Sequence, residues 1–564
     1  IRDRYSHSRL VDGLPFQPVI IATSSIALQN AIVREYLPFL SDALSDDPHI
    51  TTPILAALRK GKSHYVCDER LRQHLQQRPA NKNPTQKHEL CSLYGIFDLD
   101  ETQKLSSFDR ERVCAPQFCD CKHPDCRYRR HLTECGQKRY LFQICNQNLW
   151  LADCMHRENG LRPILPDACT VIVDEAHKLP ETAREMFGTT LTAGEIRGAV
   201  VRLKQNGYAL AADRLFSASS MLLQKMAELS PEYPFELLHD DLSRVLSTLF
   251  LIGRKLSAFL EPATKRALEQ LTDKVVLFLR PKTDAIRYTA EDDDGKLMLC
   301  SVPADITSRM QNTVWSKQIP LLLTSGTLAI GSSFRRFQDE CGLSGNPRVA
   351  EAVAVSPFDY AANCRLFFPQ RPPRFSEDER YPQTVARQIL CLLQAANGHA
   401  LVLFTSYKDM STVCECLYRF KSGIPIFVMR RNHPQILRQF KSTPGAVLLA
   451  TGAAWEGMDF PGDCVSLLII PRLPFAFPDA IHEHEKKNYP ALHDFIRSVI
   501  VPEMQIKLKQ GFGRAIRTET DTCVVAILDE RCSARGRYRQ DVLDALPEMP
   551  ILTEAVSYTH LTLP

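Results

Sequence analysis

Two acidic residues stand directly behind a short apolar run in the first half of the chain. Residues Thr170–Val173 predict a strand, and Asp174 and Glu175 follow it at once, with His177 close behind. At a strand tip, one carboxylate can hold Mg²⁺ against terminal phosphates, usually through water, while the other orients and deprotonates an attacking water. The pair therefore indicates phosphate-transfer chemistry, and a solvated acidic loop is the alternative interpretation.

Two arginines near the C-terminus form a second candidate group, in the segment Gln510-Gly-Phe-Gly-Arg-Ala-Ile-Arg517. The spacing of Arg514 and Arg517 predicts that both guanidinium groups lie on one side of a helical turn. Gly511 and Gly513 allow a close approach of the backbone. Arginines presented in this way can neutralise charge on a transferred γ-phosphoryl group, which is worth about 10³- to 10⁵-fold in rate. A surface helix with salt bridges is the alternative.

The cysteines are unevenly distributed. Most of the 19 are single residues within apolar segments, a usage that suits a reducing cytosol. Four crowd into one short segment, which predicts a bound ligand or a disulfide knot: Cys114, Cys119, Cys121 and Cys126. The segment Lys122–Tyr140 overlaps this group and carries six basic residues against two acidic ones, an excess equal to the net charge of +4 of the whole chain.

Composition and length exclude several classes of protein. A chain of 564 residues with 44% hydrophobic and 24% charged residues is neither a small disulfide-stapled scaffold nor a disordered or fibrous protein. The longest apolar runs, such as Val465–Ile470, fall far short of the roughly 20 residues that cross a bilayer. They predict buried strands.

The elements that position these residues follow a repeated order. Short apolar runs followed by hydroxyl or acidic residues, and then by helical patterns, occur at 18–23, 170–173, 319–323, 400–404 and 446–450. Strands that alternate with helices predict an α/β fold with doubly wound parallel sheets, in which ligands bind outside the carboxyl ends of the strands.

The stretch 181–300 breaks this order and predicts a helical insertion. Apolar residues there follow alternating spacings of four and three, which predicts one helix with a narrow apolar seam: Leu238, Leu242, Val245, Leu249, Ile252, Leu256 and Phe259. We expect this helix to pack within the chain as part of a helical hairpin, and a coiled-coil dimer is the alternative.

The order of these segments resembles that of the superfamily 2 DNA helicases of the DinG/XPD type, from Val19 to about Asp541. Seven segments carry the resemblance: ATSSIALQ at 22–29, VDEAH at 173–177, LTSGTL at 323–328, SPFDY at 356–360, LFTSY at 403–407, WEGMDFPG at 455–462 and QGFGRAIR at 510–517. The resemblance implies two RecA-like domains with ATP between them, an iron-sulfur insertion, a helical arch insertion, and single-stranded DNA across the top.

The resemblance also implies domain boundaries. The first helicase domain would span 1–66, 127–180 and 301–335, and it would be interrupted by an iron-sulfur insertion at 67–126 and a helical arch at 181–300. The second helicase domain would span 336–550. Residues 551–564 would be a tail, which we expect to be artefactual because its end, SYTHLTLP, resembles a translated sequencing adaptor.

Site residues follow from the same resemblance, where the letters match. Asp174 and Glu175, in the segment that also contains His177, would serve Mg²⁺ and the attacking water, and Gln510, Arg514 and Arg517 would line the nucleotide. Residues that would couple the ATP site to the DNA groove are Thr324, Ser325, Thr327, Glu456, Gly457 and Asp459. Thr23 and Ser24 would contact DNA phosphates, because hydroxyls and amides fix a strand without reading its bases. Gly326 replaces the usual alanine, which should only loosen the turn.

The cysteines resemble the ligands of a [4Fe-4S] cluster. Cys67 in KGKSHYVC would be the first ligand, and Cys114, Cys119 and Cys126 the other three, with Cys121 an alternative to Cys119. Zinc also accepts four cysteines, although it favours tighter pairs. The basic stretch, with Tyr128 and Tyr140 interleaved, would lie beside the cluster, where a duplex is split, and a solvated helix remains the alternative there.

Two segments depart from the family pattern. Asn146–Asp153 resembles the NHxLL segment with Gln147 in place of histidine, so the role of that histidine is in doubt here. No G-x-x-x-x-G-K-[ST] loop occurs in the chain, and we expect this phosphate-binding loop to lie ahead of Ile1. We accordingly expect the chain as given to bind single-stranded DNA without DNA-stimulated ATPase activity.

The function implied is that of an ATP-dependent helicase that moves 5′ to 3′ on single-stranded DNA. Its substrates would be single strands and forked or 5′-tailed duplexes, its cofactors a [4Fe-4S] cluster and Mg²⁺, and its location the cytoplasm, in DNA repair or replication stress. A nucleic-acid binding module that keeps the fold and has lost ATP hydrolysis is the alternative. The acidic pair and the arginines favour the motor, because a binding module has no chemical use for both.

Overall fold

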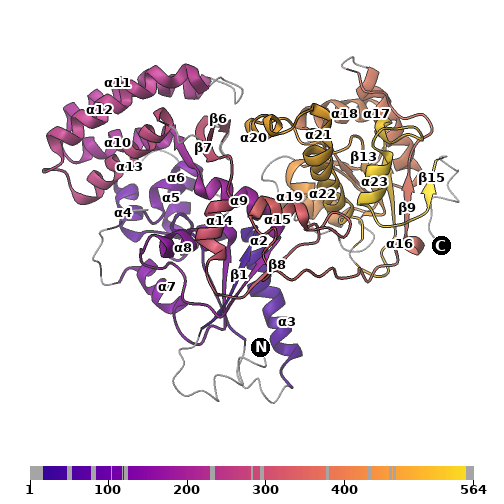
Figure 1. Ribbon diagram of the computed structural model, residues 1–564, viewed down its shortest axis with the longest axis horizontal. Helices are drawn as coiled ribbons and strands as arrows, with labels where there is room; N and C mark the ends of the chain where they lie inside the picture. Colours follow the sequence, from indigo (N-terminus) through magenta and orange to yellow (C-terminus); the bar gives the residue numbers. More distant parts are fainter. Residues whose placement is uncertain are drawn as a thin grey trace. The chain divides into compact units, whose positions relative to one another are not determined.

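The computed structural model forms two compact units. It describes residues 17–46, 54–77, 84–102, 105–116, 119, 123, 125–228, 235–280, 284–291, 297–376, 380–429, 434–455, 460, 465–516 and 518–553. Unit 1 comprises the residues up to Ser325 together with Phe337–Gly345, and unit 2 comprises Gly326–Arg336 together with the residues from Asn346 onward. Each unit contains a parallel sheet with helices against it (Figure 1).

The sheet of unit 1 has the strand order β2-β3-β1-β4-β8, and all its neighbours are parallel. The strands are β1 (Val19–Thr23), β2 (Ala56–Leu58), β3 (Phe142–Asn146), β4 (Thr170–Asp174) and β8 (Leu321–Thr324). The register pairs Thr23 with Asn146 and Asp174 with Thr324. The carboxyl ends of these strands therefore lie along one edge, and the strands predicted at 18–23, 170–173 and 319–323 are confirmed.

Helices follow β1, β3 and β4 at this edge. They are α2 (Ile26–Ala31), α8 (Gln147–Glu158) and α9 (Leu179–Phe187). A polar residue at or just after the strand end caps each of the helices α2 and α8. Ser25 Oγ accepts the N–H of Leu28 at 3.2 Å, and Asn146 Oδ1 accepts the N–H of Leu149 at 2.9 Å. Each of these side chains satisfies one of the N–H groups that the first helical turn leaves without a partner.

A helical module connects β2 to β3. Its helices are η2 (Lys62–His64), α4 (Asp68–Gln77), α5 (Pro84–Ser92), η3 (Leu99–Glu101), α6 (Ser107–Val113) and α7 (Arg127–Cys135). The module has a small apolar core of its own, built from Val66, Leu71, Leu90, Leu93, Leu99 and Val113. Because these side chains pack on one another, the module keeps a defined shape beside the sheet.

The stretch that follows α9 is helical, as expected, but it also contains a sheet. Its helices are α10 (Ala193–Gln205), α11 (Ala209–Glu228), α12 (His239–Leu256) and α13 (Pro262–Leu279), which lie side by side in Figure 1. An antiparallel sheet of β5 (Thr189–Thr192), β7 (Leu297–Pro303) and β6 (Ala285–Glu291) packs with them. The sequence prediction missed this sheet, in which β6 and β7 follow one another along the chain and only β5 lies far from its partner.

The predicted apolar seam lies on α12 and packs within the chain. Leu242, Val245, Leu249 and Ile252 are buried in a core shared with the neighbouring helices. The seam ends earlier than predicted. Helix α12 ends at Leu256, and Phe259, three residues beyond it, is 73% exposed. The spacing rule fails at this point because the chain has already left the helix.

The sheet of unit 2 has the order β11-β12-β10-β13-β14-β9-β15, again with parallel neighbours. The strands are β9 (Cys364–Phe367), β10 (Ala400–Leu403), β11 (Ile426–Val428), β12 (Val447–Ala450), β13 (Leu467–Ile470), β14 (Cys523–Ile527) and β15 (Ile551–Leu552). The helices include α17 (Arg380–Ala395), α18 (Tyr407–Arg419) and α22 (Val501–Phe512). Every residue of β10, β12 and β13 is buried, as in a sheet covered on both faces. In the described part of the chain, no helix combines the length and the apolar character needed to cross a membrane.

Candidate active site

The acidic pair of unit 1 sits at the carboxyl edge of its sheet. Asp174 is the last residue of β4, and Glu175 follows in a left-handed conformation with φ 50° and ψ 46°. The Nδ1 atom of His177 lies 3.3 Å from Glu175 Oε2 and 2.8 Å from Ser325 Oγ, and that hydroxyl donates to Glu175 Oε2 at 3.3 Å. The structure thus brings together four of the predicted site residues, from β4, the turn after it and the end of β8.

The two carboxylates have opposite electrostatic environments. Burial raises the pKa of Asp174, and the neighbouring charge of Glu175 adds to this effect. The pKa of Glu175 is lowered, because its hydrogen bond with His177 outweighs burial. Glu175 is therefore ionised under neutral conditions and can accept a proton from water, whereas Asp174 becomes fully charged more readily when a cation lies beside it.

Sequence reasoning left Gln147 without a role, and the structure places its side chain against the acidic pair. Gln147 is the first residue of α8 and is 1% exposed. Its Nε2 donates to the carbonyl oxygens of Asp174, at 2.8 Å, and Glu175, at 3.1 Å. One sequence signal could have indicated this contact. Gln147 directly follows β3, and the carboxyl ends of β3 and β4 lie at the same sheet edge.

In unit 2, the structure brings together two predicted residues, Gln510 and Thr327. Gln510 Nε2 donates to Thr327 Oγ1 at 3.4 Å, and both side chains are nearly buried. Gly511 serves packing, because a Cβ atom there would lie 2.7 Å from the ring of Trp455. That indole is itself fixed, since its Nε1 donates to the carbonyl oxygen of Phe404 at 2.8 Å.

The helical presentation predicted for the two arginines is wrong at Arg514. Helix α22 ends at Phe512 with Gly513 as its C-terminal cap, so Arg514 lies in the turn that follows. Two glycines so close together weaken the helix, which explains why it stops before the arginine. Arg517 lies outside the described residues, as do three of the predicted coupling residues: Glu456, Gly457 and Asp459.

The predicted DNA contact of Thr23 is contradicted by its burial. Its side chain is 0% exposed, and Oγ1 donates to the carbonyl oxygen of Ser25 at 3.0 Å. A short hydroxyl at a strand end often forms such a local bond, and this one closes the turn before α2. Ser24 is partly exposed and Thr324 is exposed, so both remain candidates.

The cysteines of the module lie near one another. Val66 and Cys114 form an antiparallel bridge, and the N–H of Cys67 donates to the carbonyl oxygen of Val113 at 2.8 Å. Burial raises the pKa of the Cys67 thiol, and nearby Cys119 adds to this effect. Within the described ranges, no three His, Cys, Asp or Glu side chains converge closely enough to hold a metal ion, and Cys121 lies outside those ranges.

The fourth predicted ligand, Cys126, is joined to the same place by an ion pair. Cys126 precedes α7, and the next residue, Arg127, pairs with Asp68 at 2.5 Å, beside Cys67. Arg127 also stacks on the ring of Phe97. This arginine belongs to the predicted basic stretch, but its contacts make it structural.

The aromatic residues of the basic stretch are engaged as well. The ring of Tyr128 lies 5.6 Å from that of Tyr65, and the hydroxyl of Tyr140 donates to Glu134 at 2.9 Å. Both tyrosines of the basic stretch therefore have partners within unit 1. The exposed basic residues of this stretch are Arg129, Arg130, Lys138 and Arg139, of which Arg139 pairs with Glu134.

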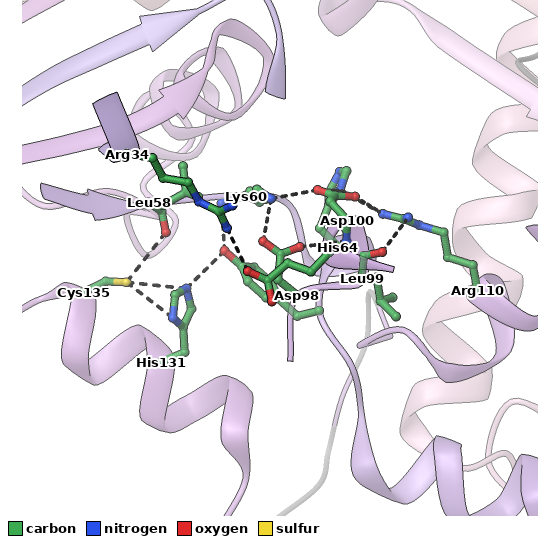
Figure 2. Close-up of polar contacts among 12 residues, drawn as sticks. Arg34, Leu58, Lys60, His64, Asp98, Leu99, Asp100, Arg110, His131 and Cys135 are labelled. Atoms are coloured by element: carbon green, nitrogen blue, oxygen red, sulfur yellow. Dashed lines mark hydrogen bonds and ion pairs between the residues drawn. The ribbon is translucent and has the colours of Figure 1, made fainter. Parts of the chain in front are cut away.

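A charged network ties the module to the end of β2 (Figure 2). Lys60, which is almost fully buried, lies 2.5 Å from Asp98 and 2.9 Å from Asp100. His64 and Arg110 contact the same Asp100 carboxylate, at 3.0 and 2.5 Å. Burial alone would raise the pKa of Asp100. The hydrogen bonds from His64, Arg110 and Lys60 outweigh burial, so the pKa of Asp100 lies below its usual range. The network is thus an ionised cluster at the base of the module.

Replacing Lys60 with methionine is expected to loosen the module by about 3–5 kcal/mol, because removal of one partner leaves poorly solvated carboxylates without compensation. The opening free energy of amides in α4 and α6, measured by hydrogen exchange, checks this value. The matched control is Arg34→Ala, since Arg34 pairs with Glu101 in the same region but both side chains are at least half exposed. That change should cost under about 1 kcal/mol. Equal protection in Lys60→Met and the parent protein would contradict the prediction.

Comparison with known proteins gives consistent matches. Residues 389–549 match the helicase C-terminal domain family. The ATP-dependent DNA helicase YoaA of Haemophilus influenzae is 27% identical over 94% of this chain and 86% of its own length, and YoaA of Escherichia coli is 27% identical over 94% and 87%. The 3′-5′ exonuclease DinG of Bacillus subtilis is 25% identical over 94% of this chain and 65% of its own length.

Solved structures support the fold. The structure titled XPD_Helicase aligns with a TM-score of 0.53 and 14% identity, covering 98% of this chain and 94% of that one. The structure of S. tokodaii Xpd4 aligns with a TM-score of 0.50 and 15% identity, covering 98% and 97%. Together with the two parallel sheets, these likenesses confirm the predicted α/β fold with RecA-like domains.

Proposed function

We propose, from the premise that this chain is a DinG/XPD-type relative of the DinG and YoaA helicases, that the protein is an ATP-dependent DNA helicase that moves 5′ to 3′ on single-stranded DNA. The observation that carries the proposal is the group formed by Asp174, Glu175 and His177 with Ser325 at the carboxyl edge of the sheet in unit 1. Ligands of such sheets bind at this edge, and the group contains the two acids that phosphate transfer needs.

In this mechanism, Asp174 would hold Mg²⁺ and Glu175 would act on the attacking water. The donor set fits, because a half-buried carboxylate with a raised pKa gains from a neighbouring divalent cation. Mg²⁺, when bound, neutralises charge on the β- and γ-phosphates. Glu175 remains ionised through its bond with His177, so it can orient the water and accept its proton.

Ser325 belongs to this group and would link it to the DNA groove. It follows Thr324 at the end of β8 and donates to Glu175, so a displacement of the turn after β8 changes the environment of the catalytic carboxylate. We therefore assign Ser325 to coupling between DNA binding and hydrolysis. Thr324, Thr327, Glu456, Gly457 and Asp459 are proposed for the same task on the strength of the family pattern.

Unit 2 is proposed to supply Gln510, Arg514 and Arg517 to the nucleotide. Gln510 contacts Thr327, which makes it part of an internal polar pair at the start of unit 2. Arg514 directly follows Gly513, the C-terminal cap of α22. Gly511 and Gly513 support this segment through packing and capping.

We further propose that the module between β2 and β3 holds a [4Fe-4S] cluster on Cys67, Cys114, Cys119 and Cys126. The support is the chemistry of the donor set, which offers four thiols. The Val66–Cys114 bridge brings the backbones of Cys67 and Cys114 together, and the Arg127–Asp68 pair joins the residues next to Cys126 and Cys67. Cys121 in place of Cys119, and zinc in place of iron, are the alternatives that the experiment below separates.

The DNA substrates proposed are single strands and forked or 5′-tailed duplexes, met in the cytoplasm during repair or replication stress. Exposed Arg129, Arg130 and Lys138 would neutralise phosphates beside the module, and Ser24 would contact the backbone of the strand. These contacts do not read bases, which suits a motor that moves along any sequence.

The test uses a version of the protein that carries the family's phosphate-binding loop, with two duplexes of equal length that carry either a 5′ or a 3′ single-stranded tail. We expect single-stranded DNA to stimulate ATP hydrolysis, and ATP to drive separation of the 5′-tailed duplex only. DNA binding without hydrolysis would favour the non-motor binding module. Separation of the 3′-tailed duplex alone would overturn the proposed polarity.

A further inference from the structure

The candidate catalytic base has a backbone conformation that needs external support. Glu175 adopts φ 50° and ψ 46°, a left-handed conformation that is strained for a residue with a side chain. The N–H of Glu175 donates to Asp174 Oδ1 at 2.9 Å, which satisfies one side of this turn. The carbonyl oxygen of Glu175 accepts the N–H of Lys178 at 3.0 Å, and a side chain gives this carbonyl and that of Asp174 a further partner each.

Gln147 supplies these partners through one nitrogen atom. Its Nε2 carries two N–H groups, and it lies 2.8 Å from the carbonyl oxygen of Asp174 and 3.1 Å from that of Glu175. These two carbonyls belong to the peptide groups before and after the Glu175 Cα atom. A single amide therefore restrains both ends of the left-handed residue and fixes the direction of its Cα–Cβ bond.

The amide is itself held in orientation. Gln147 begins α8 directly after the Asn146 cap, and Thr182 Oγ1 in α9 donates to Gln147 Oε1 at 3.4 Å. With the side chain 1% exposed, water cannot replace the amide without rearrangement of these elements. The contact thus connects the ends of β3 and β4 with the start of α9.

We propose that Gln147 is a positioning residue for ATP hydrolysis, which clamps the two carbonyls that flank the Glu175 Cα atom and so aims the Glu175 carboxylate. This inference rests on the proposed function. Gln147 touches neither substrate nor cofactor, and it acts through Glu175 alone. An amide can fill this role at any pH, because it carries no titratable proton.

The test replaces Gln147 with methionine, which keeps the length and volume of the side chain and removes both donors. A misplacement of about 1 Å can cost about 10²-fold in rate. We therefore expect kcat for DNA-stimulated ATP hydrolysis to fall by about 30- to 100-fold, with KM for ATP and the affinity for single-stranded DNA unchanged. Gln147→His, which keeps one donor, should recover part of the loss.

The matched control is Gln143→Met in β3, the strand that precedes α8. Gln143 is also 1% exposed, and its Nε2 also donates to a backbone carbonyl, that of Cys135 at 2.9 Å, away from the acidic pair. The Gln143→Met variant should lose thermal stability in the same way as Gln147→Met, and its kcat should equal that of the parent protein. An equal fall in kcat in both variants would reduce Gln147 to a structural role and overturn the inference.

Failure of this inference can be told apart from failure of the proposed function. The parent and the variants carry the phosphate-binding loop, and a parent of this kind without DNA-stimulated hydrolysis contradicts the function itself. A parent that is active and a Glu175→Gln variant that is inactive, together with full activity in Gln147→Met, contradict the inference alone. If Gln147→Met does not fold, Gln147→Asn takes its place with the same expectations, because its amide is one methylene too short to reach both carbonyls.

Discussion

Exchange of Glu175 for glutamine is expected to lower kcat for DNA-stimulated ATP hydrolysis by about 10²- to 10⁴-fold, the usual contribution of a general base. Glutamine keeps the shape of the side chain and can still contact His177 and Ser325, so the local fold should persist. Because the change removes only the proton acceptor, the affinity for single-stranded DNA and for ATP should stay close to that of the parent. Steady-state hydrolysis and fluorescence anisotropy on the same preparation measure both quantities.

The control for this experiment is Glu185→Gln. Glu185 lies on α9 of the same unit, and burial raises its pKa, but the structure gives it no place in the acidic group. The same chemical change there should leave kcat unaltered. Hydrolysis by Glu175→Gln at the parental rate would remove Glu175 from the mechanism and leave the acidic turn as a structural feature.

Mutation of Cys67 to serine is expected to abolish iron binding by the module, from about four irons per chain to none, because a cubane held by thiolates needs all its ligands. Protein purified without oxygen should be brown, and the variant colourless. Cys119→Ser should also lose iron, whereas Cys121→Ser should keep it. Iron content by metal analysis and the visible absorption spectrum provide the measurements.

The control here is Cys91→Ser, an exposed cysteine of α5 in the same module. It should bind iron as the parent does. Loss of iron in Cys121→Ser with retention in Cys119→Ser would reassign the third ligand. Stoichiometric zinc without iron in the parent would contradict the proposed cluster.

The sequence indicated the positions of strands better than the contacts of side chains. Apolar runs and the polar residues behind them were enough to place β1, β4 and β8 and the acidic pair at their ends. Whether a hydroxyl faces a ligand or its own backbone cannot be decided from spacing, and Thr23 proved to be internal. The role of Gln147 depends on contacts with residues 27 and 28 positions away, which only the paired strands bring close.

The errors in the prediction have local causes. Arg514 and Arg517 were expected on one helical turn, but the glycines in that segment end α22 at Phe512. Tyr128 was placed in a basic stretch beside a split duplex, yet its ring packs on Tyr65, a residue more than sixty positions earlier. The glycines decide the conformation at Arg514, and the contact with Tyr65 decides it at Tyr128.

The position of the module between β2 and β3 limits how such a protein can change in evolution. The two strands are parallel neighbours, with Ala56 beside Phe142, so the chain must return from one end of the sheet to the other before it can pair again. A connection of this kind needs a dozen or more residues, usually with a helix, and a tight turn cannot replace it. The module is therefore also the crossover of the sheet. It can be exchanged for another segment of sufficient length, but its deletion would break the order of the strands on which the acidic edge is built.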